Sequence, residues 1–221
     1  LIGRPGAPQA EGGSLTITGD VISSIGVSAS LWLVPDTAAA MQAAGTSSSF
    51  NLASYVPVVT PYSASEQIDP KVPGGTMLFG VDSLAGSGFS NVALVDPQGM
   101  IGFAGPVSLA LNGAFSISSG SILATNLGNF VLASTLGPRL PLNDQFKPTT
   151  KGSSLTVTAP FIALNGGSAG GFAQQADAVM TFNAQQIDIA GIAALNNMGQ
   201  TTFNSQGDIR LLPTQDGNAA F

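Results

Sequence analysis

The sequence has no cysteine and no histidine, and only 8% of its 221 residues are charged. Without cysteine the chain has neither a disulfide nor a thiolate metal site. Without histidine it lacks the commonest general base and the commonest metal ligand. We therefore expect no cofactor, no metal and no catalytic residue.

Basic residues and long apolar runs are also scarce. Six basic residues stand against 12 acidic ones, giving a net charge of −6. This balance disfavours a nucleic-acid partner, because nucleic acids are bound by clustered Lys and Arg. No apolar run approaches the roughly 20 residues that a membrane-spanning helix needs.

What the chain does contain is 44% hydrophobic residues and 28 glycines. This composition is typical of a folded core, because disordered chains are poor in apolar residues and rich in charge. The chain opens with LIGRPG, which has neither an initiator Met nor the pattern of a signal peptide. We interpret residues 1–221 as one segment of a longer protein or as a processed product.

Short stretches of alternating apolar and small residues recur along the chain, separated by glycine, serine or asparagine. They occupy residues 107–111, 114–118, 121–125, 130–134, 155–159, 161–165, 179–183, 186–190, 201–205 and 208–212. Alternation over five residues indicates a strand with one buried face. Glycine and asparagine between the stretches suit sharp bends.

The spacing of equivalent positions predicts how these strands are arranged. Ile162, Ile187 and Ile209 lie 25 and 22 residues apart, and Leu155, Val179 and Thr201 lie 24 and 22 residues apart. Three short strands per coil account for a unit of this length, and stacked coils bury their inward side chains against like neighbours. The sequence thus predicts an all-β protein, a parallel β-helix with three short strands per coil of about 22 residues.

An antiparallel β-sandwich or barrel remains the alternative. It requires hairpin turns, and Asn112-Gly113 and Asn165-Gly166 are sequences that suit them. The regular period favours the β-helix.

Two proline-rich segments interrupt the repeat, and we interpret both as excursions from the coils. The first covers residues 31–75 and includes residues 36–45, which read as a short helix with Asp36 as N-cap and Gly45 as C-terminal stop. The second covers residues 136–152.

The units GSSLTVTAPFIALNGG, AVMTFNAQQIDIAGIAAL and TTFNSQGDIRLLP resemble the C-terminal repeats of filamentous-haemagglutinin-type exoproteins. The resemblance covers most of residues 90–212 and, more weakly, residues 12–24. It implies a right-handed β-helical shaft of a secreted adhesin, located outside the cell or on the bacterial surface. It also implies an outer-membrane secretion pore of the two-partner type as a partner. We expect the family's N-terminal secretion domain and any toxin tip to lie outside these 221 residues.

Two other functions remain open. β-Helices also form carbohydrate-active lyases and hydrolases, which need clustered carboxylates on one face. The acids here are scattered; Asp188 and Asp208 lie one coil apart, and Asp208 and Arg210 read as a surface ion pair. The other possibility is the shaft of a contact-dependent inhibition toxin. Our interpretation is a non-enzymatic shaft.

Trp32, Tyr55 and Tyr62 are the candidate contact surface, because Trp and Tyr favour interfaces. Their other reading is that they hold the first excursion against the coils. The partner would be a receptor or glycan on a host or bacterial surface. Unpaired strands at the ends of the stack also predict end-to-end or lateral self-association.

Overall fold

The computed structural model describes residues 12–18, 30–35, 76–84, 87–125, 152–166, 177–191, 194–196 and 198–213. These residues form an all-β structure whose strands make up two sheets. Every strand pairing given for the described residues is parallel. The antiparallel alternative is therefore wrong for this part of the chain, and the arrangement is compatible with a parallel β-helix.

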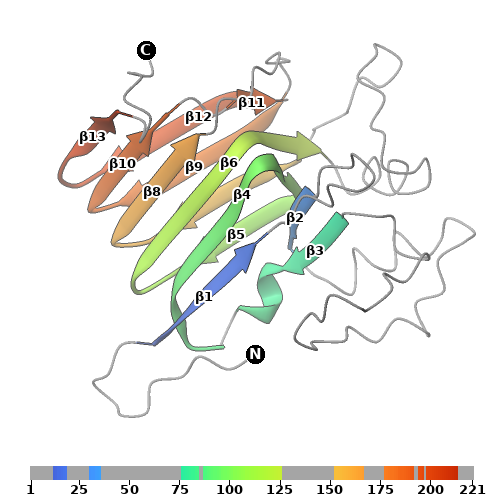
Figure 1. Ribbon diagram of the computed structural model, residues 1–221, viewed down its shortest axis with the longest axis horizontal. Coiled ribbons are helices and arrows are strands. Elements are labelled where there is room, and N and C mark those ends of the chain that lie inside the picture. The colour runs from blue at the N-terminus through green and yellow to red at the C-terminus, as the bar shows by residue number, and fades with distance from the viewer. Residues whose placement is uncertain are drawn as a thin grey trace, which may run out of the picture.

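The larger sheet has nine strands, and we call it the large sheet. Its path runs β13 (Ile209–Leu212), β10 (Gln186–Ala190), β8 (Phe161–Gly166), β6 (Ala114–Thr125), β4 (Phe89–Ala104), β2 (Ser30–Val34) and β3 (Thr76–Gly80). Off this path, β1 (Gly13–Thr18) pairs with β4, and β11 (Ala194–Asn196) pairs with β6. Figure 1 shows β4, β6, β8, β10 and β13 side by side in chain order.

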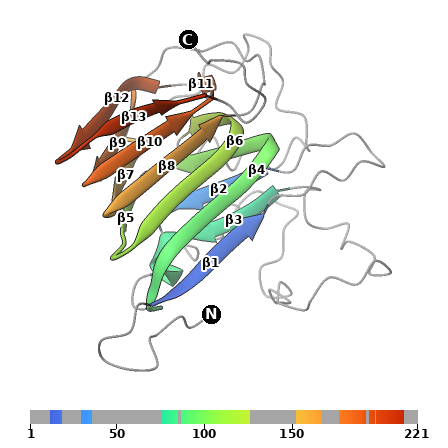
Figure 2. The same cartoon turned by 60° about the vertical axis from the view of Figure 1, so that its left-hand side comes forward.

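The smaller sheet has four strands, and we call it the small sheet. Its order is β12 (Met198–Ser205), β9 (Ala178–Ala184), β7 (Ser154–Thr158) and β5 (Pro106–Ala110). From β4 to β13 the chain alternates between the two sheets, except that β11 joins the large one. The direction in which strands succeed one another is here named the stack axis (Figure 2).

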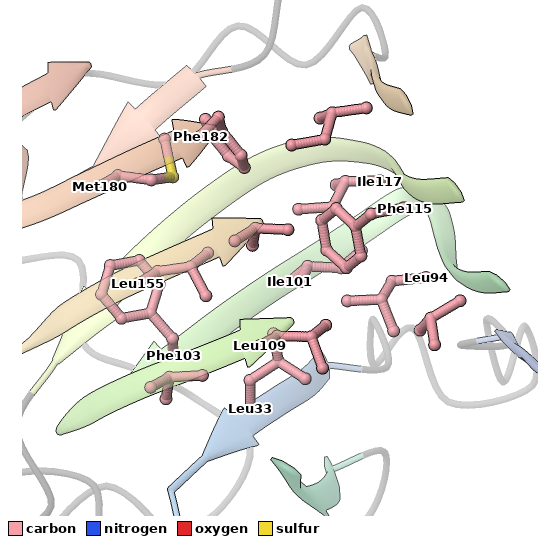
Figure 3. Close-up of a cluster of buried hydrophobic side chains, with 14 of the residues drawn as sticks. Leu33, Leu94, Ile101, Phe103, Leu109, Phe115, Ile117, Leu155, Met180 and Phe182 are labelled. Atoms are coloured by element: carbon pink, nitrogen blue, oxygen red, sulfur yellow. The ribbon is translucent and has the colours of Figure 1, made fainter. Parts of the chain in front are cut away.

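The hydrophobic core contains inward side chains of both sheets. In-register pairing places Phe115 on Ile162, Ile162 on Ile187, and Ile187 on Ile209, so like side chains follow one another along the stack axis. Figure 3 shows Leu109, Leu155, Met180 and Phe182 of the small sheet in one cluster with side chains of β4 and β6. Burying such columns between neighbours is the main contribution to the stability of a stacked repeat.

The sharp bend between the sheets after β4 uses a glycine. Gly105 separates β4 from β5 and has a φ of 78°, a conformation that side chains with a Cβ rarely adopt. The backbone N–H of Gly105 donates to the Oγ of buried Ser153, so the bend is also held by the next strand along the axis. Glycine thus supplies the bend at this position, whereas Gly120, which the sequence predicts to be at a bend, lies inside β6.

The predicted periods are partly right. Pairing of Ile187 with both Ile162 and Ile209 confirms the spacings of 25 and 22 residues. The equivalence of Leu155, Val179 and Thr201 is wrong by one residue, because Leu155 and Thr201 both pair with Met180. Met180 is fully buried whereas Val179 is 38% exposed. A shift of one residue turns each side chain to the opposite face of its strand.

Strand β2 bears on the predicted first excursion. Its residues Leu31 to Val34 lie in the large sheet between β3 and β4, so the start predicted for the excursion at residue 31 is too early. The predicted helix at residues 36–45 lies outside the described residues, as does all of residues 136–152 except Gly152. No helix in the described ranges is long and apolar enough to cross a membrane.

Candidate functional site

The connections that lead from the small sheet to the large sheet have equivalent structures in successive layers. We define each one as the C-terminal end of the small-sheet strand together with the residues that follow it: residues 158–160 at β7, 183–185 at β9 and 204–206 at β12. Thr158 pairs with Asn183, and Asn183 pairs with Asn204. The connections consequently stack on one another along the axis.

Backbone hydrogen bonds fix this stack. The N–H of Ala159 donates to the carbonyl oxygen of Asn183 over 3.1 Å, and the N–H of Gln185 donates to that of Pro160 over 3.0 Å. The N–H of Gln206 donates to the carbonyl oxygen of Ala184 over 2.9 Å. Because these peptide groups bond to neighbouring connections, the spacing of the side chains between them is set by the sheets.

A ladder of side-chain hydrogen bonds follows the same direction. Asn183 Nδ2 donates to Thr158 Oγ1 over 3.3 Å, and Asn204 Nδ2 donates to Asn183 Oδ1 over 2.9 Å. Amide ladders of this kind add to the stability of stacked parallel strands. They also restrict the rotamers of Asn183 and Asn204.

A hollow of about 390 Å³ lies along these connections, and we call it the corner groove. Its lining residues are Leu111, Thr158, Ala159, Pro160, Asn183, Ala184, Gln185, Asn204, Ser205 and Gln206. Its polar lining comprises the Thr158–Asn183–Asn204 ladder and the side chains of Gln185, Ser205 and Gln206. Ala159 and Ala184 also belong to the lining and are almost completely buried.

The chemistry of the corner groove is that of neutral hydrogen bonding. All of the described lining side chains are uncharged, and their polar groups are amides and hydroxyls. None of them is a general base at neutral pH, and a serine or threonine without a base is a poor nucleophile. These described residues can hold a ligand by hydrogen bonds.

An ion pair between Arg210 and Asp188 lies on the large sheet. Arg210 donates from Nε to Asp188 Oδ1 over 2.8 Å and from Nη2 to Oδ2 over 2.5 Å. These hydrogen bonds hold the pKa of Asp188 below its ordinary value, against the opposing effect of burial. The sequence predicts a pair between Arg210 and Asp208 on one strand, but Arg210 instead bonds its in-register neighbour Asp188.

Carboxylates of the described residues are spread over both ends and the middle of the stack. No three of the metal-ligating side chains in the described ranges gather into a group that could hold a metal ion. Asp188 is occupied by Arg210 and Gln186. Asp96 is buried at the bend of β4, in register with Ser119.

Of the predicted contact residues, the structure describes only Trp32. Its side chain is 4% exposed and belongs to a small cluster with Val34 and Ala104, against which Met100 and Leu123 pack. This environment agrees with a packing role for Trp32. Tyr55 and Tyr62 lie outside the described residues, so a contact surface formed by them stays a prediction.

Reasoning from the sequence missed the corner groove, although the sequence contains a signal for it. Thr158-Ala159-Pro160, Asn183-Ala184-Gln185 and Asn204-Ser205-Gln206 share a pattern of polar, small and then Pro or Gln. The pattern falls at the end of equivalent small-sheet strands. Recognising the pattern requires the correct register of β9. The spacing of apolar residues predicts a register for β9 that is wrong by one residue.

Comparisons with known proteins give no relative for this chain: no family model, no curated protein and no solved structure matches it.

Proposed function

We propose that this chain is part of the right-handed β-helical shaft of a secreted bacterial adhesin of the filamentous-haemagglutinin type. The observation that carries the proposal is the in-register parallel column of Phe115, Ile162, Ile187 and Ile209. A stack of this kind is stiff along its axis, since backbone hydrogen bonds and buried columns join each layer to the next. The right hand follows from the general preference of parallel crossover connections.

Low charge supports the same function. Like charges repeated at every layer, about 4.8 Å apart, would repel one another, and the chain has few of them. Its lateral faces then carry mainly hydroxyl, amide and small side chains. Such a shaft attaches through surfaces on its sides. It leaves the cell through an outer-membrane pore of the two-partner type and works outside the cell against a surface receptor or glycan.

Attachment of coated beads tests the adhesive role. Beads carrying the chain would be passed under flow over panels of bacterial and epithelial cells. Matched beads would carry a non-adhesive β-protein of the same size and net charge. We expect several-fold greater retention of the chain-coated beads on at least one cell type. Equal retention of both bead types across the panel would contradict the adhesive role.

A further inference from the structure

The corner groove has features of a binding site as well as of a structural corner. Part of its lining is already ordered, because the amides of Asn183 and Asn204 are bonded into the ladder. An amide has two N–H donors and an oxygen with two acceptor positions. Asn183 therefore keeps one donor and one acceptor position for a ligand, and the cost of ordering its side chain has been met on folding.

Two other lining residues, Gln185 and Gln206, offer amides that are not used inside the described structure. The side chains of Gln185 and Gln206 are exposed, and neither makes a hydrogen bond to another described residue. Ligands that bring both donors and acceptors can bond to these two amides and to the ladder. Carbohydrate hydroxyls are groups of this kind.

The charge of the groove lining and of the whole chain favours some of these ligands over others. None of the described lining residues is lysine or arginine, so among them the groove has no cationic partner for a carboxylate, sulfate or phosphate group. The net charge of −6 adds a weak repulsion of any polyanion. The groove therefore favours a neutral polyol over an acidic one.

The repeat of the groove along the stack axis favours a polysaccharide over a single sugar. Equivalent rows of the groove repeat at the strand spacing of about 4.8 Å. This repeat is close to the length of one sugar unit in an extended polysaccharide, so successive units meet equivalent amides. None of the described lining residues is aromatic. Binding then depends on many weak hydrogen bonds repeated along the ligand.

From these observations we infer that the corner groove binds a neutral polysaccharide chain lying along the stack axis. The inference rests on the proposed adhesive function and supplies the class of ligand through which the shaft attaches. Gln185 and Asn183, both in the lining, are the central contacts.

Affinity electrophoresis of the complete chain tests the inference. The probes are dextran, a soluble mannan and a soluble β-glucan as neutral polymers, and alginate as the acidic one, each cast into a native gel. We expect retardation by at least one neutral polymer and none by alginate. Absence of retardation by all three neutral polymers, or equal retardation by alginate, would overturn the inference.

Two variants locate the binding site. Gln185→Ala removes an exposed amide that holds nothing else in the described structure, and Asn183→Ala also interrupts the ladder. Each should weaken binding about three- to tenfold, the usual effect of one lost hydrogen bond. The matched control is Asn165→Ala, which removes an exposed asparagine from the large sheet and should leave binding unchanged.

Gln185→Ala tests whether the polysaccharide binds in the corner groove even if Asn183→Ala loses stability. If the neutral polymer retards Gln185→Ala as much as the parent chain, the polysaccharide binds elsewhere and the groove is not its site. The same conclusion follows if Asn165→Ala weakens binding as much as Gln185→Ala does.

The bead assay tests the adhesive role separately from the binding site. Beads that attach while no neutral polymer binds leave the adhesin proposal standing without the groove. A polymer that binds the groove while beads fail to attach leaves the site without the adhesive role.

Discussion

Single residues in the buried columns should dominate the stability of this fold, as Phe182 illustrates. Its ring is fully buried and stacks on Phe203 with centroids 5.6 Å apart. We expect Phe182→Ala to lower the free energy of unfolding by about 3–5 kcal/mol, through lost burial and the cavity left behind. Val179→Ala on the same strand, where the side chain is 38% exposed, should cost less than about 1 kcal/mol. Urea unfolding measures both, and equal losses would contradict the assigned face of β9.

The contact between Gly102 and Trp32 is a second residue-scale case. Gly102 pairs with Trp32, and a Cβ added at Gly102 would overlap the indole ring. Because Trp32 is 4% exposed, its ring has little room to move. Gly102→Ala should destabilise the fold by about 1–3 kcal/mol, the usual range for overpacking.

A double-mutant cycle checks the cause of that loss. With Trp32→Leu in place, Gly102→Ala should cost at least about 1 kcal/mol less than it does alone. Additive losses in the cycle would mean that the ring is not what excludes a side chain at Gly102.

Between elements, the bond from Arg210 to Asp188 fastens β13 to β10. Hydrogen bonds from Arg210 stabilise the carboxylate, so the pKa of Asp188 is lower in the folded chain than in the unfolded one. Its contribution to stability is therefore present above the ordinary pKa of about 3.8 and is lost as the pH falls through the folded value. We expect Asp188→Asn to be less stable than the parent chain at pH 7, and the difference to shrink toward pH 3.

Urea unfolding of the parent chain and of Asp188→Asn across this pH range measures the difference. The amide of Gln186 also donates to Asp188 Oδ1, over 3.1 Å, so both of its partners favour the ionised carboxylate. A stability difference that stays constant from pH 7 to pH 3 would contradict the assigned role of the ion pair.

How far the sequence predicts these elements depends on how strongly each strand specifies its face. Ile162, Ile187 and Ile209 are isoleucines whose inward face and spacing are predictable, because the period that relates them is regular. Strand β9 is ambiguous, because Val179 suits a buried position as well as Met180 does. The register that turns Met180 and Phe182 inward buries more apolar surface than the register that turns Val179 inward. Which register forms depends on the neighbouring strands.

Reasoning from the sequence missed the corner groove for a related reason. It exists only where the connections after β7, β9 and β12 stack in register, so an error of one residue in β9 hides the shared pattern. Trp32 is a case in which the residue is conspicuous in the sequence but its environment is not predictable. Its interface-prone side chain is noticeable in the sequence, but its burial depends on contacts with distant segments such as β4.

For the whole molecule, the two ends of the described stack differ. At the β1 end, the short helical turn η2 (Val81–Ser83) and the residue after it place Val81 and Leu84 in the core, 9% and 8% exposed (Figure 1). At the other end, Ile209 and Leu211 of β13 are 46% and 58% exposed. One end is thus covered by apolar side chains, and the other presents them to solvent.

Hydrogen exchange should follow this asymmetry. In a stacked repeat each layer is stabilised by its neighbours, so opening begins where a layer has a neighbour on one side only and little burial. We expect amide protection to be greatest in β4, β6 and β8, lower in β1, and lowest in β13. Exchange followed by mass spectrometry on peptides from these strands measures the order. Uniform protection along the axis, or β13 protected as well as β6, would show that the stack opens as a single cooperative unit, and the layers would then not act as separate contributors to its stiffness.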